Sequence, residues 1–284
     1  MKMDEYQDIF RLKNLTERIP LDLSRFVEDQ QRRIFFASLT LDNKPGTLAL
    51  VLALLLRYNI NILGILSEAI SKKDELEVSM FLEVPEKEVY AIDLERKLRD
   101  GINKEKMDFV KKIKVYDHLS NFDADVVHFP LFVGSLRVIT FPTSILGETI
   151  KSLMKVFNPS VVRTMFWYQG KEFGRLVEEF YEKEFSIINV NEAVNFLAIR
   201  TALHGWAITE IVELDDEKRN VTLRLFDNWE CSMFKGSSEP QSHYIRGVLD
   251  GFFSSLFKVE MEAKETKCIA KGDPYCEFEI KEKG

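Results

Sequence analysis

Residues 258–282 read KVEMEAKETKCIAKGDPYCEFEIKE, and this stretch predicts two antiparallel strands on either side of a tight turn at Gly272-Asp273-Pro274. Successive side chains of a strand point to opposite faces. Apolar residues occupy every second position in both strands and alternate with charged residues: Val259, Met261, Ala263, Cys276, Phe278 and Ile280. Each strand therefore has one face directed into a core and one face directed to solvent.

A carboxylate and two thiols fall on this buried side or next to it. Glu265 continues the phase of Met261 and Ala263, so its side chain points inward, which is costly unless the carboxylate is paired, protonated or bound to a cation. Cys276 opens the second strand with an inward side chain, and Cys268 lies between Glu265 and the turn. We expect these three side chains to lie close together.

The third cysteine of the chain reaches the same side by the same alternation. In NVTLRLFDNWEC (220–231), the apolar face of the strand continues in phase to Trp229 and Cys231 if no bulge intervenes at Asp227. Three thiols and one carboxylate would then form a four-coordinate metal site, for which Zn²⁺ is the usual ion. Its ligands are predicted to be Cys231, Glu265, Cys268 and Cys276.

Other interpretations of these residues stay open. Free cysteines are often buried in cores without any metal, and a Cys268–Cys276 disulfide is possible in geometry but fits poorly with a reducing compartment. His243 could replace Glu265 as a ligand. A zinc ion with three thiolates and one carboxylate carries two negative charges, and three lysines are candidates to compensate them: Lys264, Lys267 and Lys271.

The first half of the chain predicts a second structural unit with the order βαββαβ, the ferredoxin-like arrangement. Strands are expected at 34–41 (IFFASLTL), 59–70, 76–84 and 111–119, because these runs are apolar and rich in β-branched or aromatic residues. Helices are expected at 47–58 and 88–100, the first opening after the turn DNKPG (42–46). The fold class is therefore α+β.

The sequence of this unit resembles an ACT domain over residues 33–119. The resemblance rests on Asp42-Asn43-Lys44-Pro45-Gly46 after a strand and on Asn59-Ile60-Asn61-Ile62 after a leucine-rich helix. It implies a regulatory, amino-acid-binding domain that pairs with a second copy and holds its ligand between a strand–helix loop of one copy and a helix–strand junction of the other. Asn43, Gly46 and Asn61 are then the effector-site candidates, although they also suit simple turn and capping roles.

The second half resembles a 4-vinyl-reductase-type small-molecule-binding domain over about residues 125–282. The motifs are FWYQGKEFGRLV (166–177), LHGWAITEI (203–211), ECSM (230–233) with IRGVLDGFFSSLF (245–257), and ETKCIAKGDPYCEFEI (265–280). The resemblance implies an α+β domain with an antiparallel sheet, packed helices and a structural zinc beside an effector pocket. Ligand-binding candidates are His204, Trp206 and Trp229, but a phenol ligand is not transferred, because His204 and Trp206 do not align securely with the residues that read phenols.

We therefore expect an N-terminal arm or helix at 1–32, an ACT-like domain at 33–119, a linker at 120–130 and a ligand-binding domain at 131–284. In the last of these, a strand at 134–142, a helix at 144–158 capped by Ser144, and a hairpin turning at Asp215 to Asn220 are predicted. The 22 phenylalanines indicate an aromatic core, or a pocket for an apolar ligand.

Composition limits the partners. The net charge of −7, the isoelectric point near 5.4 and the lack of a basic run argue against direct nucleic-acid binding. The longest apolar run, at 48–56, is too short to span a bilayer, and no signal peptide opens the chain. Three cysteines then indicate reduced thiols in the cytoplasm.

No dinucleotide, phosphate-loop or hydrolase motif occurs in the sequence, which argues against catalysis. The sequence predicts a non-catalytic, homodimeric sensor that binds an amino acid and a hydrophobic or aromatic effector, with its output carried by a partner protein. Two alternatives are kept: a reductase-like enzyme acting on a tetrapyrrole or aromatic substrate, and a structural adaptor without a ligand.

Overall fold

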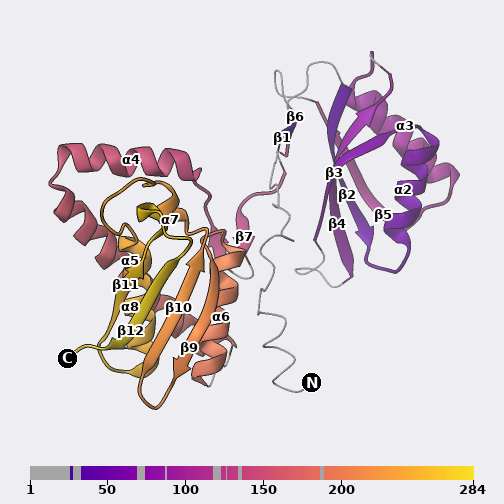
Figure 1. The fold of residues 1–284 in the computed structure, drawn as a ribbon. Coiled ribbons are helices and arrows are strands. Elements are labelled where there is room, and N and C mark those ends of the chain that lie inside the picture. The colour runs from indigo at the N-terminus through magenta and orange to yellow at the C-terminus, as the bar shows by residue number, and fades with distance from the viewer. Residues whose placement is uncertain are drawn as a thin grey trace. The chain divides into compact units, whose positions relative to one another are not determined.

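The structure, a computed structural model, describes residues 26–27, 33–68, 74–86, 88–117, 123–125, 127–133, 136–185 and 189–284. These residues fall into two compact units, one within 19–130 and one within 131–284 (Figure 1). Both units combine helices with antiparallel sheets, so the predicted α+β class is confirmed. The helix considered for residues 1–32 lies outside the described residues, apart from the two-residue strand β1 (Phe26–Val27).

The N-terminal unit has the element order β2 (Arg33–Asp42), α2 (Thr47–Arg57), β3 (Asn61–Glu68), β4 (Glu75–Val84), α3 (Ala91–Lys104) and β5 (Val110–Tyr116). Its sheet has the order β3-β4-β2-β5, with every neighbouring pair antiparallel. Figure 1 shows α2 and α3 on the same side of this sheet. Leucines of both helices pack there on the inward residues of the central strands.

The turn before α2 depends on one glycine. Gly46 has φ +87°, a left-handed conformation that costs glycine little, and α2 begins at the next residue. The hydroxyl of Thr47 bonds back to the carbonyl oxygens of Asp42 and Lys44, at 3.0 Å each. The loop therefore fixes the position at which the helix begins.

Part of the predicted linker packs against the other face of this sheet. Its strand β6 (Asp123–Ala124) pairs with β1, and the ring of His128 meets the ring of Phe36 edge-on. His128 Nδ1 lies 2.8 Å from the Asp125 carboxylate, and its Nε2 lies 3.3 Å from the hydroxyl of the buried Ser79 on β4. The end of this segment therefore belongs structurally to the N-terminal unit.

The C-terminal unit begins with the short hairpin β7 (Leu131–Val133) and β8 (Leu136–Val138), followed by α4 (Thr143–Val156), α5 (Pro159–Phe185) and α6 (Val190–Leu203). Strands β9 (Ile208–Asp215) and β10 (Asn220–Phe226) form the predicted hairpin. The helical turn α7 (Trp229–Ser232), helix α8 (His243–Phe257), strand β11 (Met261–Lys267), turn η2 (Ile269–Lys271) and strand β12 (Cys276–Glu282) complete the unit. The sheet order is β11-β12-β10-β9.

Two expectations for this region are wrong. The strand at 134–142 is only three residues long, because the chain leaves the hairpin after Val138. Ser144 does not cap α4, since the helix already includes Thr143 and follows Pro142, whose fixed φ suits the entry to a helix.

Four glycines let α5 and α8 approach each other closely. A Cβ atom at any of them would overlap the backbone of the opposite helix, in particular the carbonyl oxygens of Trp167 and Lys171 on α5 and of Tyr244 and Val248 on α8: Gly170, Gly174, Gly247 and Gly251. On the side facing the sheet, α8 contributes the fully buried Phe252 and Phe253 to the core. The crossing therefore fixes α8 between α5 and the sheet.

The predicted buried face of 258–282 is confirmed. Met261, Ala263, Phe278 and Ile280 are at most 2% exposed, and Cys276 is fully buried. Strand β11 pairs with β12, and Ala263 lies opposite Ile280. Within the described ranges, no helix has both the length and the apolar composition needed to cross a bilayer.

Candidate metal centre

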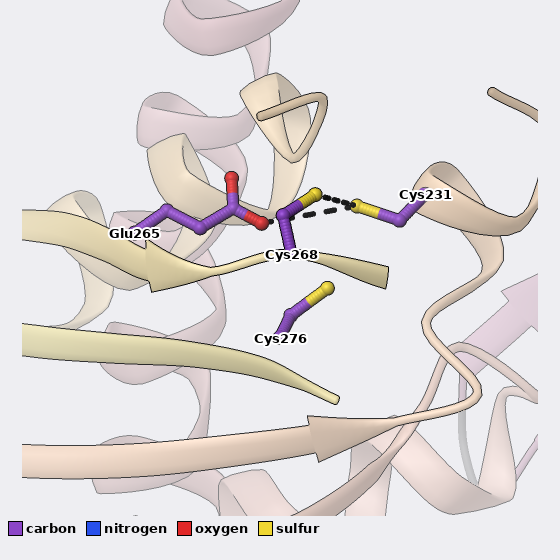
Figure 2. Close-up of side chains that lie close together, drawn as sticks. All are labelled: Cys231, Glu265, Cys268 and Cys276. Carbon is purple, nitrogen blue, oxygen red and sulfur yellow. Dashed lines mark hydrogen bonds between the residues drawn. The ribbon is translucent and has the colours of Figure 1, made fainter. Parts of the chain in front are cut away.

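Three separate elements bring one carboxylate and three thiols together. Cys231 comes from α7, Glu265 from β11, Cys268 from the residue after β11, and Cys276 from the first position of β12. One ligand atom of each residue lies within 4.8 Å of the others, and all three cysteines are fully buried free thiols. Figure 2 shows Glu265, Cys268 and Cys231 directed toward one another, with Cys276 beside them.

The route of Cys231 into this cluster differs from the prediction. Strand β10 ends at Phe226, and Asp227 has φ +52°, which ends the extended conformation. The Asn228 side chain accepts a 3.1 Å hydrogen bond from the backbone N–H of Glu230 and caps the turn α7. Trp229 and Cys231 therefore do not continue the strand, and a helical turn carries the thiol inward.

The donor set fits a zinc ion. A tetrahedron with Zn–S bonds of about 2.3 Å has its sulfur corners about 3.8 Å apart. The sulfur of Cys231 lies 3.4 Å from that of Cys268 and 3.9 Å from Oε1 of Glu265. Three soft thiolates and one carboxylate are ligands that Zn²⁺ accepts, whereas hard cations such as Mg²⁺ prefer oxygen alone.

The electrostatics of the cluster also favour a cation. Hydrogen bonding to Cys268 raises the pKa of Cys231, whereas hydrogen bonds from Cys231 and Cys276 lower the pKa of Cys268. Burial raises the pKa of Glu265 to about 8, and the neighbouring Cys268 contributes to the same shift. Four acidic groups in so small a volume cannot all ionise unless a positive charge compensates them.

The lysines predicted to compensate this charge do not contact the cluster. Lys267 bonds to the hydroxyl of Tyr275 at 3.0 Å and forms an ion pair with Glu277, while Lys264 and Lys271 are exposed. Hydrogen-bond donors take their place: the carboxamide of Asn228 and the hydroxyl and N–H of Ser242, both residues buried. Sequence reasoning did not find either residue, although both directly precede a helix, as capping residues do.

The alternative ligand His243 is not part of the cluster, whose carboxylate member is Glu265. Burial and the nearby Arg163 and Arg246 lower the pKa of His243 to about 4, so the ring is neutral at physiological pH. Its Nε2 is buried without a hydrogen-bond partner among the described residues.

The predicted ligand-binding aromatic residues meet next to the cluster. The Trp206 ring centroid lies 5.8 Å from that of Tyr244 and 5.3 Å from that of Phe173, and the Trp229 ring lies 6.1 Å from Tyr244. The backbone N–H of Trp229 donates to the carbonyl of Trp206 at 2.9 Å. Two hollows of this unit, of about 400 and 280 Å³, lie elsewhere, along α5 and α8 and beside α6.

His204 borders this group but is already engaged. It ends α6, its Nδ1 lies 2.9 Å from the carbonyl oxygen of Arg200, and its Nε2 lies 3.1 Å from the Arg200 guanidinium. Burial lowers the pKa of His204, which suits a neutral ring that accepts from Arg200. Both ring nitrogens thus have partners one helical turn away.

The N-terminal candidates lie at opposite ends of α2. Asn43 and Gly46 are exposed residues in the loop before this 11-residue helix, and Asn61 follows its end. At 1.5 Å per residue the helix separates the two ends by about 16 Å. The Asn61 carboxamide donates to Glu83 at 3.0 Å. The three residues therefore do not form one site within a single copy of the chain.

Comparison with known families bears on the C-terminal unit. The family model of the vinyl-4-reductase domain matches residues 221–282, which include all four residues of the cluster. This match supports the predicted 4-vinyl-reductase-type domain at the C-terminus. An uncharacterized protein of Methanocaldococcus jannaschii is 23% identical over 126 residues, or 42% of this chain, and the match spans 66% of that relative, just under two thirds of its length.

Two solved structures are similar in part. The phenol-responsive sensory domain of the transcription activator PoxR, with phenol, is 19% identical, with a TM-score of 0.49 over 53% of this chain and 79% of that domain. The ACT domain of a GTP pyrophosphokinase of Chlorobium tepidum is 15% identical, with a TM-score of 0.23 over 30% of this chain and 99% of that domain.

Proposed function

We propose that this chain is a non-catalytic small-molecule sensor whose C-terminal domain is crosslinked by a structural Zn²⁺ on Cys231, Glu265, Cys268 and Cys276. The observation that carries the proposal is the convergence of four donor atoms within 4.8 Å from three elements. Four protein ligands leave no open coordination position for water or a substrate, which distinguishes structural from catalytic zinc. A bound zinc supplies a crosslink between α7, β11 and β12, and thereby free energy of folding.

The effector of this domain is proposed to be a hydrophobic or aromatic molecule that contacts Trp206 and Trp229. Both tryptophans meet Tyr244, whose ring lies at the start of α8. Trp229 Nε1 is buried without a hydrogen-bond partner among the described residues, so an effector with an acceptor group would satisfy it. His204 orients the end of α6 through Arg200 and is not proposed to contact the effector directly.

The N-terminal unit is proposed to be an ACT-type domain that binds an amino acid between two copies of the chain. The support is the placement of the candidates: Asn43 and Gly46 lie at one end of α2 and Asn61 at the other, so a second copy is needed to bring them together. The N–H groups at the start of α2 suit a carboxylate, and carboxamides suit both polar ends of an amino acid. A homodimer is therefore part of the proposal.

Each effector can change the output only through its different affinity for two arrangements of the dimer. The output is proposed to pass to a partner protein. A thermal-shift screen of amino acids and of aromatic metabolites tests this function. A ligand at a hundred times its dissociation constant stabilises the fold by about 2.7 kcal/mol. Stabilisation by one compound class supports the sensor, whereas no stabilisation by any compound favours an adaptor without a ligand.

A further inference from the structure

A serine that is not a metal ligand makes the closest contacts with the cysteine–glutamate cluster. The hydroxyl of Ser242 lies 2.8 Å from the sulfur of Cys231 and 2.8 Å from Oε1 of Glu265. Its backbone N–H donates to Oε2 of the same carboxylate at 3.3 Å. Ser242 therefore holds both oxygens of Glu265, and it is itself only 1% exposed.

Ser242 precedes α8 at the position of a capping residue, yet its side chain forms no capping hydrogen bond. The carboxylate of Glu230, the residue before Cys231, accepts instead from the N–H groups of Tyr244 and Ile245, at 2.8 and 3.0 Å. A serine at this position ordinarily accepts from such N–H groups itself. Because Glu230 takes that role, the Ser242 hydroxyl is directed to the cluster.

Asn228 completes the arrangement on the other side. Its Nδ2 lies 3.0 Å from the Ser242 hydroxyl, 3.5 Å from the sulfur of Cys276 and 3.6 Å from that of Cys231. Asn228 is fully buried, so these are the partners that its amide hydrogens have. A carboxamide that donates to Ser242 leaves the serine hydroxyl hydrogen for the carboxylate or the thiol.

The charge of the cluster explains the need for these donors. A zinc ion with three thiolates and one carboxylate retains two negative charges, and among the described residues no lysine or arginine side chain bonds to the four ligands. Neutral donors and the N-terminus of a helix stabilise anionic groups. The start of α8 supplies both, through the hydroxyl and the N–H of Ser242.

We propose that Ser242 is the positioning residue that links zinc binding to the start of α8. The inference rests on the proposed zinc site and deepens it. Ser242 fixes the Glu265 carboxylate as a ligand, and in return the occupied site fixes the first turn of α8. Tyr244 lies two residues further on, where its ring contacts Trp206 and Trp229, so the link extends to the proposed effector contacts.

The test compares the full-length wild type with Ser242→Ala and Ser254→Ala. Ser254 lies on the same helix and bonds only to the backbone of Met261, at 2.8 Å to its N–H, so it is the matched control. Zinc affinity is measured by competition with a chelator, and the ligand-field spectrum of bound Co²⁺ reports the coordination geometry. Loss of an outer-shell partner typically weakens metal binding by about 10–100-fold.

We expect Ser242→Ala to bind zinc about 10–100-fold more weakly and to alter the Co²⁺ spectrum, and Ser254→Ala to match the wild type. If the wild type binds zinc and Ser242→Ala binds it equally well, the positioning role is wrong while the zinc site stands. If the wild type itself binds no zinc, the proposed metal site fails, and this inference fails with it.

A measurement on the wild type alone covers the case in which Ser242→Ala does not fold. Amide hydrogen exchange is followed with zinc and after chelation. The first turn of α8, residues 242–246, is expected to lose protection on chelation, while β9 and β10 keep theirs. Unchanged exchange at 242–246, or an equal loss throughout the domain, would overturn the specific link.

Discussion

The sulfur atoms of Cys231 and Cys268 lie 3.4 Å apart although 37 positions of sequence separate the two residues. One sulfur arrives on a helical turn and the other at the end of a strand, so the contact exists only when the C-terminal domain is folded. A metal at this place therefore stabilises the folded state and not the unfolded chain.

Replacing the carboxylate ligand tests the composition of the site. In Glu265→Gln the charge is lost while the size is kept, so zinc affinity should fall by at least the roughly 10–100-fold that losing an outer-shell partner costs. Glu262→Gln, an exposed position on the same strand, is the control and should bind as the wild type does. Equal zinc affinity of the two variants in a chelator competition would remove Glu265 from the ligand set.

The crossing of α5 and α8 should not tolerate a methyl group. In Gly251→Ala the new Cβ overlaps the carbonyl oxygen of Lys171, a backbone atom that cannot turn aside. We expect a loss of about 1–3 kcal/mol or more in the free energy of unfolding, measured in urea. Gly147→Ala is the control, because its Cβ meets the flexible side chain of Met233 and should cost less. Equal losses in the two variants would contradict the tight crossing.

A buried carboxylate joins α5, α8 and β11. Asp250 accepts from the indole N–H of Trp167 at 2.6 Å and from the N–H of Ala263 at 2.5 Å, and burial raises its pKa above the usual 3.8. The folded state then binds this proton more tightly than the unfolded chain does. The free energy of unfolding should therefore fall as the pH rises from 3.8 through the raised pKa.

Asp250→Asn isolates this effect, because the asparagine does not titrate. The difference in unfolding free energy between wild type and variant should favour the wild type most at low pH and shrink as the pH rises, in urea titrations across this range. A difference that grows with pH would mean that the pKa of Asp250 is lowered by folding.

The proposed site between two N-terminal units predicts complementation. Asn43→Ala and Asn61→Ala should each abolish stabilisation by the amino-acid ligand found in the screen. A refolded equimolar mixture should recover about one site in four, because a mixed two-fold dimer has one intact and one doubly altered site. Calorimetric titration measures the recovered sites. No recovery in a mixture shown to contain mixed dimers would place the ligand within one copy.

Much of the fold follows from local patterns. The alternation in 258–282 was enough to assign both strands and their buried faces, and the six elements of the N-terminal unit follow from apolar runs between turn residues. These predictions succeed because each depends on neighbours within one strand or helix. The α4 boundary failed for a local reason as well, since Pro142 outweighs the capping preference of Ser144.

The site was predicted less completely. The four ligands could be proposed from phase and spacing, but the path of Cys231 could not, because a positive φ at Asp227 converts a strand phase into a helical turn. The sequence signal available was Asn228 directly before Trp-Glu-Cys, a capping pattern. Ser242 could not be assigned to the cluster at all, because its role depends on Glu230 replacing it as the helix cap.

The central claim is that the four residues hold one structural zinc, and the metal content per chain tests it most directly. Wild type and Cys268→Ser, purified without chelator, are compared by mass spectrometry. The account predicts close to one zinc per wild-type chain and a large loss in the variant. Wild-type protein without metal, even after incubation with Zn²⁺, would contradict it and would leave the three cysteines as core residues.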